Sequence, residues 1–393
     1  MNVRKLETGE HGITRPLWEE VFSEDTREFL DYYYYIKAKE NEIFVVEEDG
    51  ELCSMLHLNP YTLAVGSRQA ESAYIVAVAT KEACRSRGFM RALLHTSLQH
   101  MYDRKVPFTF LMPAAEAIYR PYDFRFIYRQ DVGTLSGAGE AAGGGKATAG
   151  AQAAEEGRLT GSDAALWQAG EAADFFGQNF SGRWQVYALR DAAYYQTMIM
   201  EQQSERGGVR FVRDRGQLIG MYAYAVEDGM EIREPLFLPG YEDAFSFSVR
   251  ELLKSRGRDG AEQVRVSACP ADMAQEEKPV IMARIVCLRE FLGLLETGEE
   301  TELCCSFAVL DPILKQNSRV WRIESRAGET GVRVREAEDS EGVFPVAELT
   351  EYLFGQMDME ALKKCESVIL TEHLALELEK IRKLTDVFLN EIV

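Results

Sequence analysis

The chain of 393 residues is long enough for two or three domains, and its 46% of hydrophobic residues can fill sizeable cores. The formal net charge of −20 argues against binding to nucleic acid, which needs clustered Lys and Arg. It would attract a cationic partner, and the other interpretation is that it only keeps the protein in solution. No apolar run approaches the roughly 20 residues of a membrane span or resembles a signal peptide, so we expect a cytoplasmic protein without a membrane span.

The cysteines and histidines give no sign of a metal site or a disulfide framework. The seven cysteines are odd in number and form no CxxC pair, and the five histidines have no metal-ligand spacing. We therefore expect free thiols in the core and no metal.

The first third of the chain alternates strands and helices. Residues 43–47 and 52–58 are predicted as two strands joined by an Asp-Gly hairpin turn, and the apolar run over 74–80 is predicted as a central strand. A helix with one apolar face and another buried strand follow, over 90–101 and 108–112. This alternation is typical of an α/β domain.

A Gly- and Ala-rich stretch without aromatic residues, 133–158, follows this first domain of residues 1–132. Such a composition buries too little apolar surface to fold alone. We predict a linker or a long surface loop.

The next part of the chain, residues 159–281, partly repeats the first. Residues 211–218 echo residues 44–52, and further strands are predicted up to Leu238. No glycine-containing basic turn follows Leu238. This second copy is therefore predicted to lack a ligand site.

The character of the chain changes again at residue 282. Strands are predicted at 302–310, 318–325 and 331–336, with helices at 288–295 and from Pro345. We expect a separate α+β domain over 282–393, which ends in the apolar tail TDVFLNEIV.

The predicted central strand over 74–80 runs into a basic turn that opens a helix. The backbone N–H groups and the dipole of a helix start favour an anion, and Arg85, Arg87 and Arg91 add full charges. Gly88 removes a Cβ that would block close approach. The turn is predicted to hold a pyrophosphate, although it is neither a P-loop nor the GxGxxG dinucleotide turn. The other interpretation is a basic turn that caps an ordinary helix.

The form of this turn, RxxGx followed by a helix, is similar to the acyl-CoA signature of the GNAT fold. Met90 stands where that signature usually has Gly or Ala. In GNAT proteins a tyrosine follows the next strand in a pattern like FYxxxGF. The segment IYRPYDF, residues 118–124, lies in that position, with Tyr119 as the tyrosine and Asp123 in place of Gly. The alternative for Tyr119 is a core tyrosine with a satisfied hydroxyl.

The whole chain resembles the Eis (enhanced intracellular survival) acetyltransferases, through RSRGFMRALL, AAEAIYRPYDF, the degenerate second copy and the α+β tail. The resemblance implies an α/β and α+β multidomain protein with tandem GNAT folds, the second degenerate, followed by a sterol-carrier-protein-like domain. It also implies an N-acetyltransferase that uses acetyl-CoA, needs no metal and assembles as a homo-hexamer.

The resemblance further implies the residues of the site. The acetyl-CoA contacts fall on Val78, Ala79, Thr80, Arg85, Ser86, Arg87, Gly88, Phe89, Met90, Arg91, Ala114 and Ala115. Relatives often have Ser-Glu at the last two positions. Tyr119 matches the general acid, and the free C-terminal carboxylate of Val393 matches the general base. The apolar tail is consistent with docking onto the first domain, and the other interpretation makes it the last strand of the third.

The acceptor implied is a primary amine of a cationic small molecule, aminoglycoside- or polyamine-like, or of a lysine side chain. Trp18, Asp25, Phe29 and Asp31 lie where GNAT folds place substrate-binding helices, and an aromatic and acidic wall suits a cation. At helical spacing, half of the tyrosine run over 32–35 must be core. The alternative function is a non-catalytic protein that senses acetyl-CoA or binds an apolar ligand, and turnover of any amine separates the two.

Overall fold

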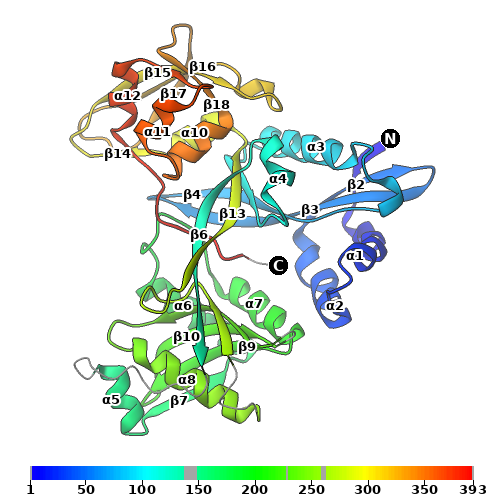
Figure 1. Cartoon of the computed structure of the whole chain (residues 1–393), viewed down its shortest axis with the longest axis vertical. Coiled ribbons are helices and arrows are strands. Elements are labelled where there is room, and N and C mark those ends of the chain that lie inside the picture. The colour runs from blue at the N-terminus through cyan, green and yellow to red at the C-terminus, as the bar shows by residue number, and fades with distance from the viewer. Residues whose placement is uncertain (1, 137–147, 227–228, 258–262, 392–393) are drawn as a thin grey trace.

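A computed structural model of the chain describes residues 2–136, 148–226, 229–257 and 263–391 (Figure 1). It contains three units: the first (blue and cyan) lies between the second (green) and the third (orange and red). Two long strands, β6 (Arg125–Ser136) and β13 (Glu276–Ile285), run from the first unit to the second. No helix within the described ranges is long and apolar enough to cross a membrane.

The first unit is a sheet with helices on both faces, in the strand order β1-β2-β3-β4-β5-β13-β6. Its other elements are β1 (Asn2–Lys5), α1 (Arg15–Val21), α2 (Arg27–Tyr35), β2 (Glu42–Glu48), β3 (Glu51–Val65), β4 (Arg68–Thr80), α3 (Phe89–Asp103), β5 (Phe108–Leu111) and α4 (Glu116–Tyr119). The side chains of β2 alternate between the two faces of the sheet. Phe44 and Val46 join the core beneath α3, whereas Ile43 and Val45 join the core beneath α1 and α2. The predicted α/β arrangement is confirmed.

The second unit repeats the hairpin of the first. It consists of α5 (Ala149–Glu155), β7 (Leu159–Asp163), α6 (Ala169–Asn179), β8 (Val186–Ala188), α7 (Ala192–Ser204), β9 (Gly208–Asp214), β10 (Gln217–Ala225), β11 (Glu231–Phe237), α8 (Glu242–Ser255) and β12 (Gln263–Ser267). Asp49 and Gly50 turn the β2–β3 hairpin with φ of 53° and 82°, and Arg215 and Gly216 turn β9–β10 with φ of 50° and 85°. Two successive left-handed residues make the turn that matches strand twist. The predicted second copy of the half-sheet is confirmed.

The stretch predicted as a linker, 133–158, is partly structured. Residues 133–136 extend β6, and α5 begins at Ala149, while 137–147 lie outside the described residues. A Cβ at Gly133 would lie 2.4 Å from the Met273 carbonyl oxygen, and one at Gly150 would lie 3.0 Å from the Ala244 nitrogen. These glycines permit close packing, a use that composition cannot distinguish from flexibility.

Strand β13 returns from the second unit to the first. It pairs antiparallel with both β5 and β6, although its last residues, from 282, were predicted to open the third domain. Residues 281–285, four of them apolar, are fully buried there, as expected for a strand with neighbours on both sides.

The third unit packs helices on a five-stranded sheet of order β17-β16-β15-β18-β19. Its elements are α9 (Leu288–Leu294), β14 (Glu296–Thr297), β15 (Leu303–Leu310), β16 (Val320–Ser325), β17 (Arg333–Ala337), β18 (Gly342–Pro345), α10 (Val346–Leu353), α11 (Met359–Lys364), β19 (Ile369–Leu370), α12 (Glu372–Leu378) and β20 (Ile381–Arg382). The α+β prediction is confirmed. Five of the seven cysteines are buried and all seven are free, but Cys304 is exposed and Cys365 is half-buried.

The C-terminal tail leaves the third unit. Its strand β21 (Val387–Phe388) pairs parallel with β8, and β8 pairs antiparallel with the end of β3. The tail thus runs between the first and second units (Figure 1). The interpretation of the tail as the last strand of the third domain's sheet is wrong.

Candidate active site

The central strands β4 and β5 diverge. In the described structure they share one parallel register pair, Tyr74 opposite Phe110. Ala77 has a φ of 51°, and Ala77 and Val78 together stand opposite Leu56 of β3, which makes a β-bulge. The edge of β4 that faces away from β3 therefore has backbone groups without a strand partner. An extended ligand can bond to this edge as a neighbouring strand would.

The three strand residues predicted to contact acetyl-CoA lie at and after this bulge. The Ser54 hydroxyl donates to the Ala79 carbonyl at 2.6 Å and shares a hydrogen bond with the Thr80 hydroxyl at 2.7 Å. These bonds hold the end of β4 from its β3 side. The diverging side stays open.

The turn after β4 has the geometry of an anion site. Gly88 has a φ of 82°, and the first backbone bond of α3 joins Ala92 N–H to the Gly88 carbonyl at 3.0 Å. The N–H groups of Phe89, Met90 and Arg91 consequently have no partner within the helix. A Cβ at Gly88 would meet no atom within 4 Å, so the approach to the helix start is open. The glycine is needed there for its left-handed backbone and not for lack of space.

The three arginines of the turn differ in their partners. Arg87 forms an ion pair with Glu48 at 2.5 Å and lies 5.0 Å from the centre of the Phe89 ring. The Glu48 carboxylate raises the pKa of Arg87. Arg85 and Arg91 form no ion pair with any described residue, so their charges are available to a phosphate.

Tyr119 ends helix α4 and is 8% exposed. Its ring packs 5.9 Å from that of Phe124, and its hydroxyl makes no hydrogen bond to the described residues. Burial raises the pKa of Tyr119 to about 12, so the hydroxyl is a neutral proton donor near pH 7. The ring packs in the core beneath α3, as the alternative interpretation of Tyr119 also expects.

The departures from the family pattern have local explanations. Asp123 has a φ of 65°, the conformation that glycine adopts easily, and Asp tolerates it better than most residues. Its carboxylate also lies 3.6 Å from Arg284. Met90 is half-buried and packs against the core beneath α3. Ala114 and Ala115 are exposed just before α4 and offer backbone groups only.

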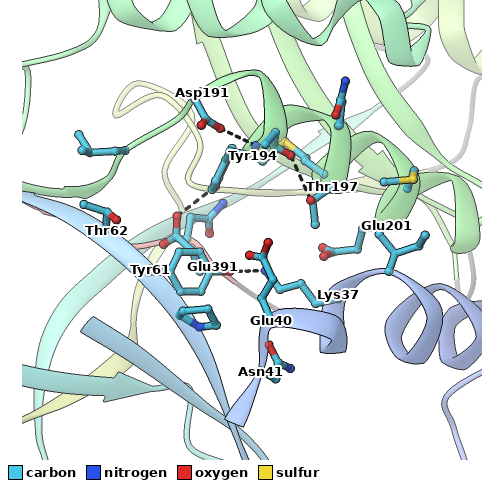
Figure 2. Close-up of a pocket in the computed structure, with 18 of the residues that line it drawn as sticks. Lys37, Glu40, Asn41, Tyr61, Thr62, Asp191, Tyr194, Thr197, Glu201 and Glu391 are labelled. Carbon is cyan, nitrogen blue, oxygen red and sulfur yellow. Dashed lines mark hydrogen bonds between the residues drawn. The ribbon is translucent and has the colours of Figure 1, made fainter. Parts of the chain in front are cut away.

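A cleft of about 880 Å³ lies where the first unit, the second unit and the C-terminal tail meet (Figure 2). Its walls come from the short helix Lys37–Glu40, from β3, from α7 and from the tail. Six acidic residues face three basic ones around it, a formal charge of −3: Glu40, Glu71, Asp191, Glu201, Glu234 and Glu391 against Lys37, Lys39 and Arg233. The cleft therefore favours a cation.

Burial perturbs the charged groups at the centre of the cleft. Lys37 Nζ donates to the Tyr61 hydroxyl at 2.9 Å, and burial lowers the pKa of Lys37. Burial also raises the pKa of Glu201, which accepts a hydrogen bond from the Tyr32 hydroxyl at 3.1 Å. Groups with such shifts are common in functional sites, which makes this cleft the candidate for the amine.

The cleft and the diverging strands share a wall of aromatic rings. Tyr61 lines the cleft, and its ring lies 6.5 Å from Tyr74 and 5.9 Å from Phe110. Tyr74 and Phe110 form the pair at which β4 and β5 separate. The ring of Tyr61 thus separates a molecule in the cleft from the opening between β4 and β5.

The residues predicted to bind substrate do not line this cleft. Trp18 and Phe29 are buried in the core beneath α1 and α2, and Trp18 Nε1 donates to Asp25 at 2.6 Å. Asp31 pairs with Arg15 at 2.6 Å. Trp18 and Phe29 thus face the core of the first unit, and the role of the four residues in substrate binding stays a prediction. The division of the tyrosine run is confirmed, because Tyr32 and Tyr33 are buried, Tyr34 is half-buried and Tyr35 is exposed.

The cleft residues of α7 and the tail were missed. Tyr194 and Glu391 are 197 positions apart and meet through a hydrogen bond of 3.0 Å. No spacing in the sequence signals such a contact. Val393, the predicted base, lies outside the described residues; the last described residues are held by Gln130, which donates to Asn390 at 2.5 Å, and by Tyr194.

Comparison with known domain families identifies two parts of the chain. Residues 2–127 match the acetyltransferase (GNAT) domain, and residues 288–391 match the sterol carrier protein domain. The chain therefore contains a GNAT acetyltransferase domain followed by a sterol carrier protein domain, and it is an enzyme of the N-acetyltransferase class. No curated protein matches the sequence.

Solved structures share the whole arrangement. A conserved protein from Enterococcus faecalis V583, a probable N-acyltransferase, has 16% identity and a TM-score of 0.81 over 100% of this chain and 99% of its own. A GCN5-related N-acetyltransferase from Anabaena variabilis has 16% identity and a TM-score of 0.76, with 99% of each chain covered. Eis1 from Mycobacterium abscessus has 14% identity and a TM-score of 0.70, again with 99% of each covered. At these identities the likeness shows a shared fold, so the Eis-like architecture is confirmed.

Proposed function

We propose that this enzyme transfers acetyl from acetyl-CoA to a primary amine of a cationic small molecule, aminoglycoside- or polyamine-like, or of a lysine side chain. The observation that carries the proposal is the shared aromatic wall between an acidic cleft and the opening between β4 and β5. An amine in the cleft can meet an acyl group held between the strands.

The cofactor would follow the path that the open backbone groups define. The pyrophosphate would lie at the turn Ser86 to Arg91, and the pantetheine arm would run along Val78, Ala79 and Thr80. Open space before Gly88 and the unpaired charges of Arg85 and Arg91 support this assignment. Ala114 and Ala115 would add backbone contacts.

The transfer would be a direct attack. The amine gives up a proton and attacks the thioester carbonyl, whose oxygen is stabilised by an N–H of the bulged strand β4. Collapse of the adduct breaks the C–S bond, and Tyr119 gives its proton to the leaving thiolate. The C-terminal carboxylate of Val393 would take the proton of the amine. Support for this last role is the course of the tail up to Glu391, which lines the cleft.

A panel of amines tests the proposal. We expect acetyl-CoA consumption with di- and polyamines or aminoglycosides, and little with neutral or anionic amines, because the lining charge is −3. Acetyl-CoA binding without turnover of any amine would instead support the non-catalytic sensor.

The Eis-like architecture also leads us to propose a homo-hexamer, and the composition favours a cytoplasmic location. Light scattering at micromolar concentration should give about six times the chain mass of 44.4 kDa. A mass near 44.4 kDa would contradict the hexamer.

A further inference from the structure

The second unit has kept the bulge of the first unit's central strand. Glu234 of β11 has a φ of 53°, against 51° for Ala77 of β4. In β11, Glu234 and Pro235 stand opposite Tyr222, just as two residues of β4 stand opposite one of β3. The two bulges occupy equivalent places in the repeat.

The second unit has lost the anion site that should accompany this bulge. Helix α8 starts with Glu242 and Asp243, which disfavour a phosphate at a helix N-terminus. Helix α5 packs on the same end, where a Cβ at Gly150 would lie 3.0 Å from the Ala244 nitrogen. The retained bulge therefore serves something other than a coenzyme.

The carboxylate of Glu234 holds a buried arginine. Arg190 Nη2 lies 2.8 Å from Glu234, and the Arg190 side chain is 1% exposed. Three rings surround the guanidinium, with centres 4.7 Å away for Phe176, 5.0 Å for Tyr194 and 5.0 Å for Phe388. Two of these residues belong to the second unit and Phe388 belongs to the tail.

Arg190 lies at the centre of a set of contacts that hold the tail. It also lies 3.8 Å from Glu391, which accepts the Tyr194 hydroxyl at 3.0 Å. Phe388 stacks on Trp184 with centres 4.0 Å apart and planes 9° apart. All these partners come from 184–194, the segment around β8.

One cation serves two buried carboxylates in this cluster. Burial raises the pKa of Glu391 to about 7, Arg190 opposes this and Glu234 adds to it. Displacing Arg190 would leave Glu234 without its ion pair in a desolvated place, which is strongly unfavourable. Lys37 acts on Glu391 as well, but of the described residues only Arg190 joins both acids to the ring of Phe388.

We propose that the second unit, no longer a coenzyme site, uses its retained bulge to fix Arg190, and that Arg190 positions the C-terminal tail at the active site of the first unit. The effect on turnover rests on the proposed function. Arg190 acts through the tail and is a positioning residue. Since Glu234 and Glu391 both line the cleft, the same cluster shapes the wall that faces the amine.

The test compares Arg190→Lys with Arg213→Lys. Lysine keeps the charge but loses the planar group that fills the ring cage. Arg213 is the matched control, since it pairs with Glu171 at 2.6 and 2.7 Å and lies 5.5 Å from the Phe211 ring without touching the tail. The readouts are release of C-terminal residues by carboxypeptidase, acetyl-CoA affinity by calorimetry, and kcat.

We expect Arg190→Lys to speed carboxypeptidase release and to lower kcat by up to about 10²-fold, the effect of a misplaced group. Acetyl-CoA affinity should stay unchanged, and Arg213→Lys should change none of the three. If Arg190→Lys does not fold, Phe388→Leu removes one ring of the cage from the tail side and should give the same result.

Unchanged carboxypeptidase release in the Arg190 variant would overturn the proposal, and so would a released tail with full kcat. Digestion needs no acetyl transfer. If the wild-type enzyme acetylates no amine, the proposed function fails while faster digestion of the variant still supports the role of Arg190 in holding the tail.

Discussion

At the scale of single residues, Tyr119 carries the proposed general acid. It is buried, its pKa is raised to about 12, and it has no hydrogen-bond partner in the described structure. Its ring is held in the core beneath α3, so a ligand that reaches the hydroxyl would meet a positioned proton donor.

Replacing Tyr119 by Phe should therefore lower kcat by about 10²- to 10⁴-fold, the usual contribution of a general acid. Acetyl-CoA affinity should be almost unchanged, because the anion site at α3 is untouched. Steady-state kinetics and calorimetry on the same preparations measure both. Tyr122→Phe, on the next turn of chain, is the control and should retain activity; an unimpaired Tyr119→Phe would remove the tyrosine from the mechanism.

Glu391 gives a prediction about pH. Its folded-state pKa of about 7 is above the ordinary 4.5, so the folded protein binds this proton more tightly than the unfolded chain does. The stabilisation is present below the ordinary pKa and is lost as pH rises through 7. Between about pH 5 and about pH 8, the melting temperature of wild type should fall relative to Glu391→Gln. A difference that is constant with pH would contradict the raised pKa.

At the scale of elements, the start of α3 and the start of α8 occupy equivalent positions in the two copies of the repeat. Gly88 and Gly240 have φ of 82° and 85°, and a Cβ at either would meet no atom within 4 Å. A side chain costs roughly 1–2 kcal/mol of backbone strain at each. Of the two, only Gly88 lies between arginines that form no ion pair with a described residue, Arg85 and Arg91, and only the start of α3 is uncovered.

Calorimetry should consequently find one acetyl-CoA site per chain, lost in Gly88→Trp and kept in Gly240→Trp. The indole would fill the space before α3, whereas the equivalent space before α8 has no ligand to lose. Two sites per chain, or equal effects of the two variants, would show that the anion site is assigned wrongly.

The same elements show what could be predicted from the sequence. The Asp49-Gly50 turn and the turn that carries Gly88 each depend on adjacent residues, so both turns could be predicted from the local sequence. Trp18 and Phe29 were assigned to substrate by resemblance, and no pattern in the sequence tells what the faces of their two helices meet. In the structure both side chains are buried in the core beneath α1 and α2.

At the scale of the whole molecule, the cleft could not be predicted because three distant parts of the chain build it. Lys37, Tyr194 and Glu391 come from the first unit, the second unit and the tail. Strand β13 adds a further long-range link, since it crosses back to complete the first unit's sheet. Neither contact has a local signal, whereas the domain types follow from patterns that each unit carries by itself.

The course of the tail through these units gives the sharpest test of the catalytic base. If the Val393 carboxylate takes the amine's proton, a few residues added after Val393 should lower kcat by about 10²- to 10⁴-fold, because the carboxylate becomes a neutral amide. Val393→Ala should do far less, since the carboxylate stays. A tail that matters only for packing would reverse this order, because the side chain would then count for more than the charge.

Carboxypeptidase digestion is the control. It should show that residues up to Glu391 remain docked in the extended chain, where Trp184, Tyr194 and Arg190 still hold them. Full activity of the extended chain would transfer the role of base to a carboxylate within the cleft, and Glu391, with its pKa of about 7, would be the first to replace.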